Sequence, residues 1–447
     1  MKAIPLEPVV DPSVPAQSTA SGSVQPWAIA FAGMASLAIA MGIGRFAFTP
    51  LLPMMLHDGT LTLAQGSWLA TANYLGYLAG ALFGMALPWL APRAYAVLHP
   101  AVLAKLGIAF TAIFTVAMAL PLSLASPGLW TALRFGAGVC SAITLLGVAS
   151  WCMVRLAALG RAELAALIFA GPGMGILLTG LFASGMVKLQ WHATSGWLLF
   201  AVLALLMCIP IWPVIAGRAA LPVTGANAAT TASVAHAPAA PVPARVLHAV
   251  AYGLSGLGYI VSATFLPVIA RAVLPGDSIW ADLFWPIAGL GAVVGIVLSV
   301  RAKPHWDRRW LLIAAYLVQA SGIALGLLLP TTLGFALGSV LLGLPFTVIT
   351  FFGLQEARRL WPTSADSFVA LVSVLYGIGQ IAGPPMVAWL LHHSAEGSKG
   401  FERGLGLAAA SLVVGAGMYL VSVVVWPLRL AGSRPGGRVT FFFQKRK

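Results

Sequence analysis

Long apolar runs, separated by short polar segments, occupy most of the chain. A helix of about 20 apolar residues is long enough to cross the hydrocarbon core of a bilayer. The runs that reach this length lie near residues 27–56, 65–89, 103–124, 127–153, 162–187, 194–216, 245–271, 279–300, 310–330, 333–356, 365–391 and 405–428. The pattern therefore predicts an all-α membrane protein with twelve transmembrane helices.

The segment between the sixth and seventh runs divides the chain. Residues 217–244 are rich in Ala, Pro and Thr and have no hydrophobic period, as is typical of a flexible linker. We therefore predict an N-terminal six-helix bundle over 27–216 and a C-terminal six-helix bundle over 245–430. Residues 1–26 and the basic segment 431–447 are predicted to be tails.

One stretch of the first run recurs in the seventh. Residues 42–53 read GIGRFAFTPLLP and residues 256–267 read GLGYIVSATFLP, at an offset of 214. A second pair, AGPGM at 170–174 and AGPPM at 382–386, lies at an offset of 212. Matches at nearly one offset indicate a chain made of two similar halves. The equivalent residues predicted by the repeat are Gly44 with Gly258 and Pro53 with Pro267.

The composition agrees with a membrane protein and excludes other classes. The chain is 60% hydrophobic and 8% charged, with a mean hydropathy of +0.94, whereas soluble proteins carry about 25% charged residues. The net charge of +14 does not indicate a nucleic-acid partner, because the basic residues are dispersed over short loops. The three cysteines are interpreted as small apolar residues without a disulfide or metal framework; they are Cys140, Cys152 and Cys208.

The charge distribution predicts the orientation in the membrane. With the N-terminus inside, the inner segments hold 19 of the 25 Lys and Arg residues and the outer loops hold 4. Short loops rich in Lys and Arg stay in the cytoplasm, so both termini are predicted to be cytoplasmic. The first apolar run is too long for the core of a signal peptide, so no cleavable signal is expected.

Several features resemble the major facilitator superfamily. One feature is the arrangement of twelve helices in two halves. The superfamily's arginine-and-glycine motif is resembled by residues 133–142, LRFGAGVCSA, and its glycine-proline motif by residues 170–180, AGPGMGILLTG. The signature between the second and third helices is reduced to scattered positive charge in PRAYAVLHPAVLAK. The closer resemblance, to the YbfB/YjiJ-like bacterial branch, is carried by residues 42–53, 72–82, 256–267 and 377–386.

This resemblance implies a secondary transporter of the bacterial inner membrane, with its substrate site near the midplane between the halves. The glycine-proline motif is often linked with antiporters. The expected partners are a small-molecule substrate and membrane lipid but no nucleic acid, for a monomer without a cofactor. Gating or packing roles are assigned to Gly42, Gly44, Pro53, Gly171, Pro172, Gly383 and Pro384.

The two remaining basic residues, Arg45 and Arg134, fall inside predicted helices. A charge there is unfavourable by roughly 3 kcal/mol or more, so it commonly marks a functional site. Arg45 could bond to helix carbonyls, reach outward, or hold an anionic substrate. The repeat favours the last of these, because it places Tyr259 at the equivalent position on the facing wall. Arg134 could bind substrate, assist proton movement or bridge helices.

Other polar residues within the helices are weaker candidates. Those considered for substrate contact are Thr49, Asn73, Tyr77 and Gln380. Asn73 and Tyr77 share a helix face, but an amide such as Asn73 or Gln380 more often satisfies a neighbouring helix. No acid falls at a predicted midplane. Asp282, about one turn inside the eighth helix, is the innermost acid and the coupling candidate, with an acid at the membrane interface as the alternative.

The motifs do not favour an enzyme. The chain has no G-x-x-x-x-G-K-[ST] phosphate loop, and the adjacent His392 and His393 are a weak metal signal. Three hypotheses remain: transport of a small organic anion, antiport of an apolar or cationic compound, and a membrane sensor or scaffold. The missing interior acid disfavours a cation, and the absence of a recognisable soluble domain in the tails disfavours the third.

Overall fold

The computed structural model describes residues 25–90, 93, 99–120, 127–215, 239–275, 278–303, 306–394 and 397–428. The predictions for the two tails and for most of the linker fall outside these ranges and stay predictions. The end of the linker needs a correction, because helix α10 begins at Val242. The backbone N–H of Ala240 donates to the carbonyl of Leu360 at 2.8 Å, which fixes the approach to that helix.

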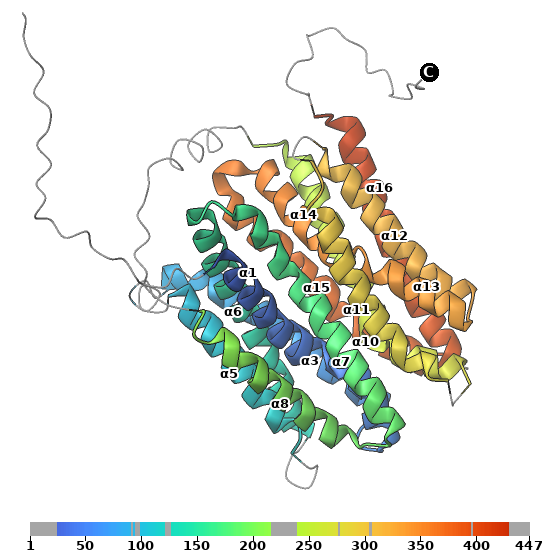
Figure 1. Ribbon diagram of the computed structural model, residues 1–447. Coiled ribbons are helices and arrows are strands. Elements are labelled where there is room, and N and C mark those ends of the chain that lie inside the picture. The colour runs from blue at the N-terminus through green and yellow to red at the C-terminus, as the bar shows by residue number, and fades with distance from the viewer. Residues whose placement is uncertain are drawn as a thin grey trace, which may run out of the picture.

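In the described part of the chain six crossings form the N-terminal half, a crossing being a helix or run of helices that passes from one end of the bundle to the other (Figure 1). The first crossing consists of α1 (Pro26–Leu37), the π-helix η1 (Ala38–Phe46) and α2 (Phe48–His57). The next five are α3 (Leu63–Leu90), α5 (Pro100–Ala117), α6 (Pro127–Ala158), the 3₁₀-helix η2 (Ala162–Phe169) with α7 (Ala170–Lys188), and α8 (Ala193–Ile211).

Six more crossings form the C-terminal half within the described ranges. They are α10 (Val242–Val273), α11 (Trp280–Ser299), α12 (Arg308–Leu328), α13 (Thr332–Gly343) with α14 (Phe346–Leu360), α15 (Ala365–His392) and α16 (Gly397–Val425). The short η3 (Pro362–Ser364) joins α14 to α15.

Eleven helices of the described chain are long and apolar enough to cross a membrane. Helix α3 is outside that count, but its 28 residues extend over about 42 Å at 1.5 Å per residue. It packs against both α6 and α15. The predicted all-α fold with twelve transmembrane helices is therefore confirmed.

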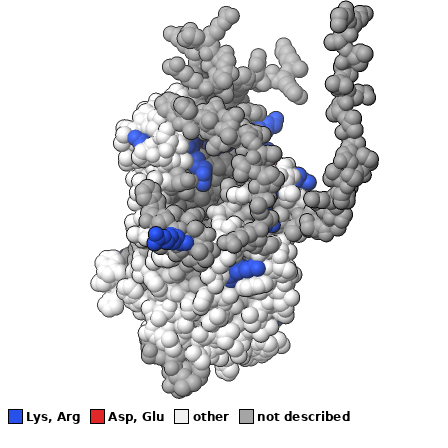
Figure 2. Space-filling model, turned by 90° about the vertical axis from the view of Figure 1, so that its left-hand side faces the viewer, with Lys and Arg blue, Asp and Glu red and all other residues white. Residues whose placement is uncertain are grey.

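Helix α1 begins and α16 ends at the same end of the bundle, along its upper side in Figure 1, which we call the terminal end. In Figure 2 the visible Lys and Arg side chains gather in the upper part of the molecule, and its lower part is largely uncharged. Large apolar side chains such as Leu181, Val202 and Leu420 are exposed along the helices, as a surface in contact with lipid requires.

The repeat reappears as matched packing in the two halves. In each half the first crossing packs against the fifth, as α10 does against α15, and the second packs against the fourth, as α3 does against α6. Between the halves α7 packs on α11 and α3 packs on α15. Glycines allow the first of these contacts, since a Cβ atom at Gly180 would lie 2.5 Å from Cδ of Pro286.

The first crossing is irregular where the repeated stretch begins. Its π-helical segment η1 is almost entirely buried, and short π segments are frequent at functional sites. Gly42 permits a close approach to α7, since a Cβ atom there would lie 2.3 Å from Cα of Gly175. Beyond the segment, Pro50 and Pro53 have no N–H to donate, so the helical bonding pattern is interrupted again. The irregular crossing carries Arg45 into the centre of the bundle.

Candidate functional site

A cavity of about 90 Å³ lies between the two halves beside Arg45. In its lining, Arg45 is the only charged residue among those that the structure describes. The N-terminal half contributes Leu37, Met41, Arg45, Tyr77, Leu145, Phe169 and Pro172. The C-terminal half contributes Tyr252, Tyr259, Phe346, Thr347, Thr350, Leu354, Ser373, Tyr376 and Gln380.

Arg45 reaches across the boundary between the halves. Its Nη2 atom donates to Oε1 of Gln380 on α15 and, at 3.4 Å, to the hydroxyl of Tyr259 on α10. The Nε2 atom of Gln380 donates to the same hydroxyl at 2.6 Å. These three side chains, which we call the Arg45 triad, are at most 3% exposed. The triad therefore ties the first crossing to two helices of the other half.

Contacts across the boundary follow the repeat. Arg45 and Tyr259 are 214 residues apart, and so are Thr49 and Ala263, the offset found in the sequence. The Oγ1 atom of Thr49 donates to the carbonyl of Ala263 at 2.6 Å. Equivalent residues of the two halves thus face each other, as they do across the symmetry axis of an isologous interface.

Aromatic rings rather than carboxylates surround the guanidinium of Arg45. Its Cζ atom lies 4.6 Å from the ring centroid of Tyr77 and 4.8 Å from that of Tyr74, within the range of cation–π attraction. Among the described residues no acid pairs with Arg45, and its Nε atom has no hydrogen-bond partner. A buried charge without a counter-charge is costly, so the guanidinium of Arg45 is suited to bind an anion.

Arg134 lies outside the cavity lining and braces the N-terminal half. Its Nη1 atom donates to the carbonyl of Gly44 at 3.0 Å, and Nη2 donates to the carbonyl of Arg45 at 3.2 Å. In a π-helix the N–H for the Arg45 carbonyl would come from residue 50, a proline without one. Asn73 is also outside the lining and donates to the Arg134 carbonyl at 2.9 Å. This arrangement corresponds to the helix-bridging alternative for Arg134.

Polar bonds close the boundary on one side of the triad. Thr49 lies about one turn beyond Arg45, and its bond to Ala263 is joined by one between the hydroxyls of Tyr74 and Thr264 at 2.9 Å. Thr49 therefore contacts the facing half and does not line the cavity. The cavity extends the other way, toward the terminal end, where Leu354 of α14 lines it.

The acids that the structure describes lie away from the cavity. Asp282 is in the first turn of α11, where it pairs with Arg271, and Oγ of Ser184 donates to its carbonyl at 3.0 Å. The side chain of Asp282 is 13% exposed, whereas that of Glu356, which pairs with Arg359, is 1% exposed. Glu356 on α14 is therefore the more deeply buried acid, which the sequence did not reveal because it lies near the end of a predicted run.

The motif glycines are packing positions. An added Cβ atom would lie 2.3 Å from the Met34 carbonyl at Gly171, 2.3 Å from Cγ2 of Ile260 at Gly383, and 2.7 Å from Cγ2 of Thr111 at Gly44. The motif prolines differ in location: Pro172 lines the cavity, whereas Pro53 and Pro384 lie inside helices α2 and α15.

Three tyrosines at the site were missed from the sequence. Tyr252 and Tyr376 line the cavity, and Tyr74 packs on Arg45. The distribution of tyrosines along the sequence could have indicated this site, because five of the eight tyrosines in the chain lie in the lining or pack on Arg45. Tyrosine in membrane proteins is otherwise enriched at the two interfaces, so tyrosines in the middle of several helices indicate a shared polar interior.

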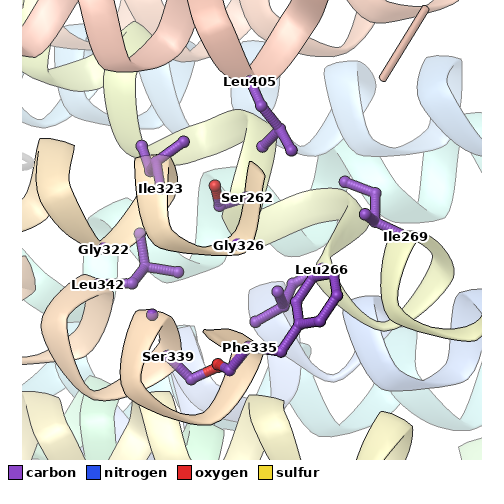
Figure 3. Close-up of a pocket in the computed structure, with 11 residues that line it drawn as sticks. Ser262, Leu266, Ile269, Gly322, Ile323, Gly326, Phe335, Ser339, Leu342 and Leu405 are labelled. Atoms are coloured by element: carbon purple, nitrogen blue, oxygen red, sulfur yellow. The ribbon is translucent and has the colours of Figure 1, made fainter. Parts of the chain in front are cut away.

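A second, smaller cavity lies within the C-terminal half between α10, α12, α13 and α16 (Figure 3). Its volume is about 20 Å³, room for about one water molecule. The labelled side chains that line it are apolar apart from the hydroxyls of Ser262 and Ser339, and Phe335 closes one side (Figure 3). It has no charged lining residue among those described, unlike the cavity beside Arg45.

The sequence and the fold were compared with known proteins. Residues 37–420 match a family model described as "Uncharacterised MFS-type transporter YbfB". No curated protein matches the chain. Among solved structures, the crystal structure of a D-xylose-proton symporter is similar, with a TM-score of 0.65 and 15% sequence identity over 90% of this chain and 97% of that one. At this identity the structural likeness supports the fold alone.

Proposed function

The chain belongs to the family described as "Uncharacterised MFS-type transporter YbfB". On that premise we propose that it carries a small organic anion across the bilayer. Its family and fold are those of a secondary transporter rather than of a catalytic enzyme. Alternating access would come from rocking of the two halves about the cavity between them.

The observation that carries the proposal is the unpaired guanidinium of Arg45. It is 2% exposed and lines the cavity, and among the described residues it has neither a carboxylate partner nor a bond to Nε. Arginine presents a planar fork that fits a carboxylate with two parallel bonds. A bound anion would therefore supply the missing counter-charge and acceptor together.

Efflux of a cation is the weaker alternative. The aromatic lining would attract a cation, but Arg45 would repel it, and no carboxylate is present among the described lining residues to offset that repulsion. An apolar compound would leave the Arg45 charge without a partner. The charge of Arg45 therefore favours an anionic substrate over a cationic or an apolar one.

The orientation is proposed from charge. Most described basic residues outside the membrane interior lie at the terminal end, including Arg155, Arg301, Lys303 and Arg308, whereas Lys188 and Arg271 lie at the opposite end. Because positive loops stay inside, the terminal end is placed in the cytoplasm. In this orientation the cavity reaches toward the cytoplasm, and a monomer in the inner membrane stays our prediction.

Flux measurements with purified protein in liposomes test the proposal. The panel contains labelled anions, neutral compounds and cations matched in size, each offered with and without a proton gradient. Saturable movement of anions that unlabelled anions suppress is expected. Movement of cations or neutral compounds alone would overturn the anion assignment, and movement of nothing in any gradient would favour the sensor hypothesis.

A further inference from the structure

We propose that the anion is an aromatic monocarboxylate whose carboxylate binds Arg45 and whose ring packs against the tyrosines of α10 and α15. This inference rests on the proposed function, because it takes Arg45 as the anchor for an anion. It adds the shape of the substrate and the number of charges that the substrate carries, both of which follow from the other residues that line the cavity.

Stacked tyrosines form one wall of the cavity. The rings of Tyr252 and Tyr376 stack with centroids 5.0 Å apart, and those of Tyr376 and Tyr259 stack at 5.8 Å with an interplanar angle of 12°. Phe346 on α14 extends the wall, with its centroid 5.0 Å from that of Tyr259. Aromatic pairs attract beyond the effect of buried area, so this wall suits a flat aromatic body better than an aliphatic one.

The lining can balance one negative charge and not two. Arg45 is the only charged residue among the described lining residues. Arg134, the other arginine in the membrane interior, already donates both Nη atoms to backbone carbonyls. A second carboxylate would therefore be buried without a counter-charge, which is costly.

The side chain of Gln380 marks the place of the carboxylate. Its Oε1 atom accepts from Nη2 of Arg45, whereas Nε of Arg45 has no partner among the described residues. A carboxylate accepts two parallel bonds from a guanidinium, so it would replace the amide oxygen and also satisfy Nε. Displacing Gln380 breaks one bond between the halves, so binding loosens the boundary that must move.

The volume limits the body of the substrate to one ring. The cavity measures about 90 Å³, and a buried apolar cavity of about 150 Å³ binds one benzene molecule. A single ring therefore needs the cavity to widen, as it would if the Gln380 side chain moved away from Arg45. A fused ring system is too large for the same space.

Calorimetric titration of the full-length protein with four probes tests the inference. The probes are benzoate, cyclohexanecarboxylate, benzamide and phthalate, which separately vary aromaticity and charge. Benzoate should bind about 2- to 12-fold more tightly than cyclohexanecarboxylate, because of the aromatic wall. It should bind at least about tenfold more tightly than neutral benzamide or dianionic phthalate, because one charge-assisted contact is lost or one charge is left unpaired.

Failure of this inference and failure of the proposed function give different results. Equal affinity for benzoate and cyclohexanecarboxylate overturns the aromatic assignment and leaves the anion proposal intact. Benzamide binding as tightly as benzoate overturns the anion proposal. If none of the four binds at millimolar concentration, the aromatic class is wrong, and the flux of non-aromatic anions in liposomes still decides the anion proposal.

Variants at Tyr376 connect the preference to the wall. Tyr376→Leu removes the central ring of the stack, so the affinity ratio of benzoate to cyclohexanecarboxylate should fall toward one. Tyr376→Phe keeps the ring and should retain the ratio, as should Phe335→Leu, which removes a ring from the smaller cavity. Melting without ligand verifies that each variant is folded. An unchanged ratio in Tyr376→Leu overturns the role of the wall.

Discussion

Replacement of Arg45 separates a substrate anchor from a structural brace. In Arg45→Lys the charge remains, but the planar fork that can bond a carboxylate twice is lost. Each charge-assisted hydrogen bond contributes about 1.5–3 kcal/mol. Loss of one of two such bonds should therefore weaken anion binding by roughly 10- to 150-fold, at 1.4 kcal/mol for each factor of ten. Arg45→Ala removes the charge as well and should weaken binding further.

Arg134→Lys provides the matched control for this measurement. Arg134 is also an arginine buried in the membrane interior, but its bonds go to the carbonyls of Gly44 and Arg45 rather than to the cavity. Its substitution should lower the melting temperature and change anion affinity much less than Arg45→Lys does. Binding isotherms and melting curves on both variants give the comparison. Unchanged affinity with a lower melting temperature in Arg45→Ala would refute the anchor role and assign Arg45 to bracing.

The remaining predictions concern packing, coupling and topology. Gly42→Ala should lower stability by about 1–3 kcal/mol, because its Cβ atom would lie 2.3 Å from Cα of Gly175. Gly417→Ala is the control and should not lower stability, because its Cβ atom would have nothing within 4 Å. Equal melting temperatures of the two variants would contradict the close packing at Gly42. Asp282→Asn removes the ion pair with Arg271 but no cavity contact, so liposome uptake should persist, and loss of concentrative uptake with exchange intact would assign coupling to Asp282. A cysteine introduced at Ala226 in the central segment should react with an impermeant reagent only from the cytoplasmic side. Labelling of this cysteine in intact cells would contradict the predicted topology.

The architecture could be predicted because the bilayer imposes simple rules on sequence. Each crossing needs about 20 apolar residues, and the repeated stretch lies in the first crossing and in α10, as the offset of 214 implies. Local irregularity was harder to predict. The π-helical turn at Ala38–Phe46 depends on how Gly42 packs against α7 and on donors from Arg134, which are contacts between distant segments.

The site was predictable where symmetry constrained it and not elsewhere. The repeat placed Tyr259 opposite Arg45, and the two side chains are hydrogen-bonded. Single-residue chemistry could not separate Gln380, which bonds to Arg45 in the cavity, from Asn73, which bonds to backbone carbonyls. Both are amides in apolar helices, and only the packing of neighbouring helices decides which of them lines a cavity.

A structure of the protein with a bound monocarboxylate tests the central claim most directly. The account predicts that the two carboxylate oxygens bond to the guanidinium of Arg45, and that the side chain of Gln380 has left its present position on Nη2. The ring of the ligand should lie against Tyr376. An anion bound elsewhere, with the bond between Arg45 and Gln380 intact, would contradict the account.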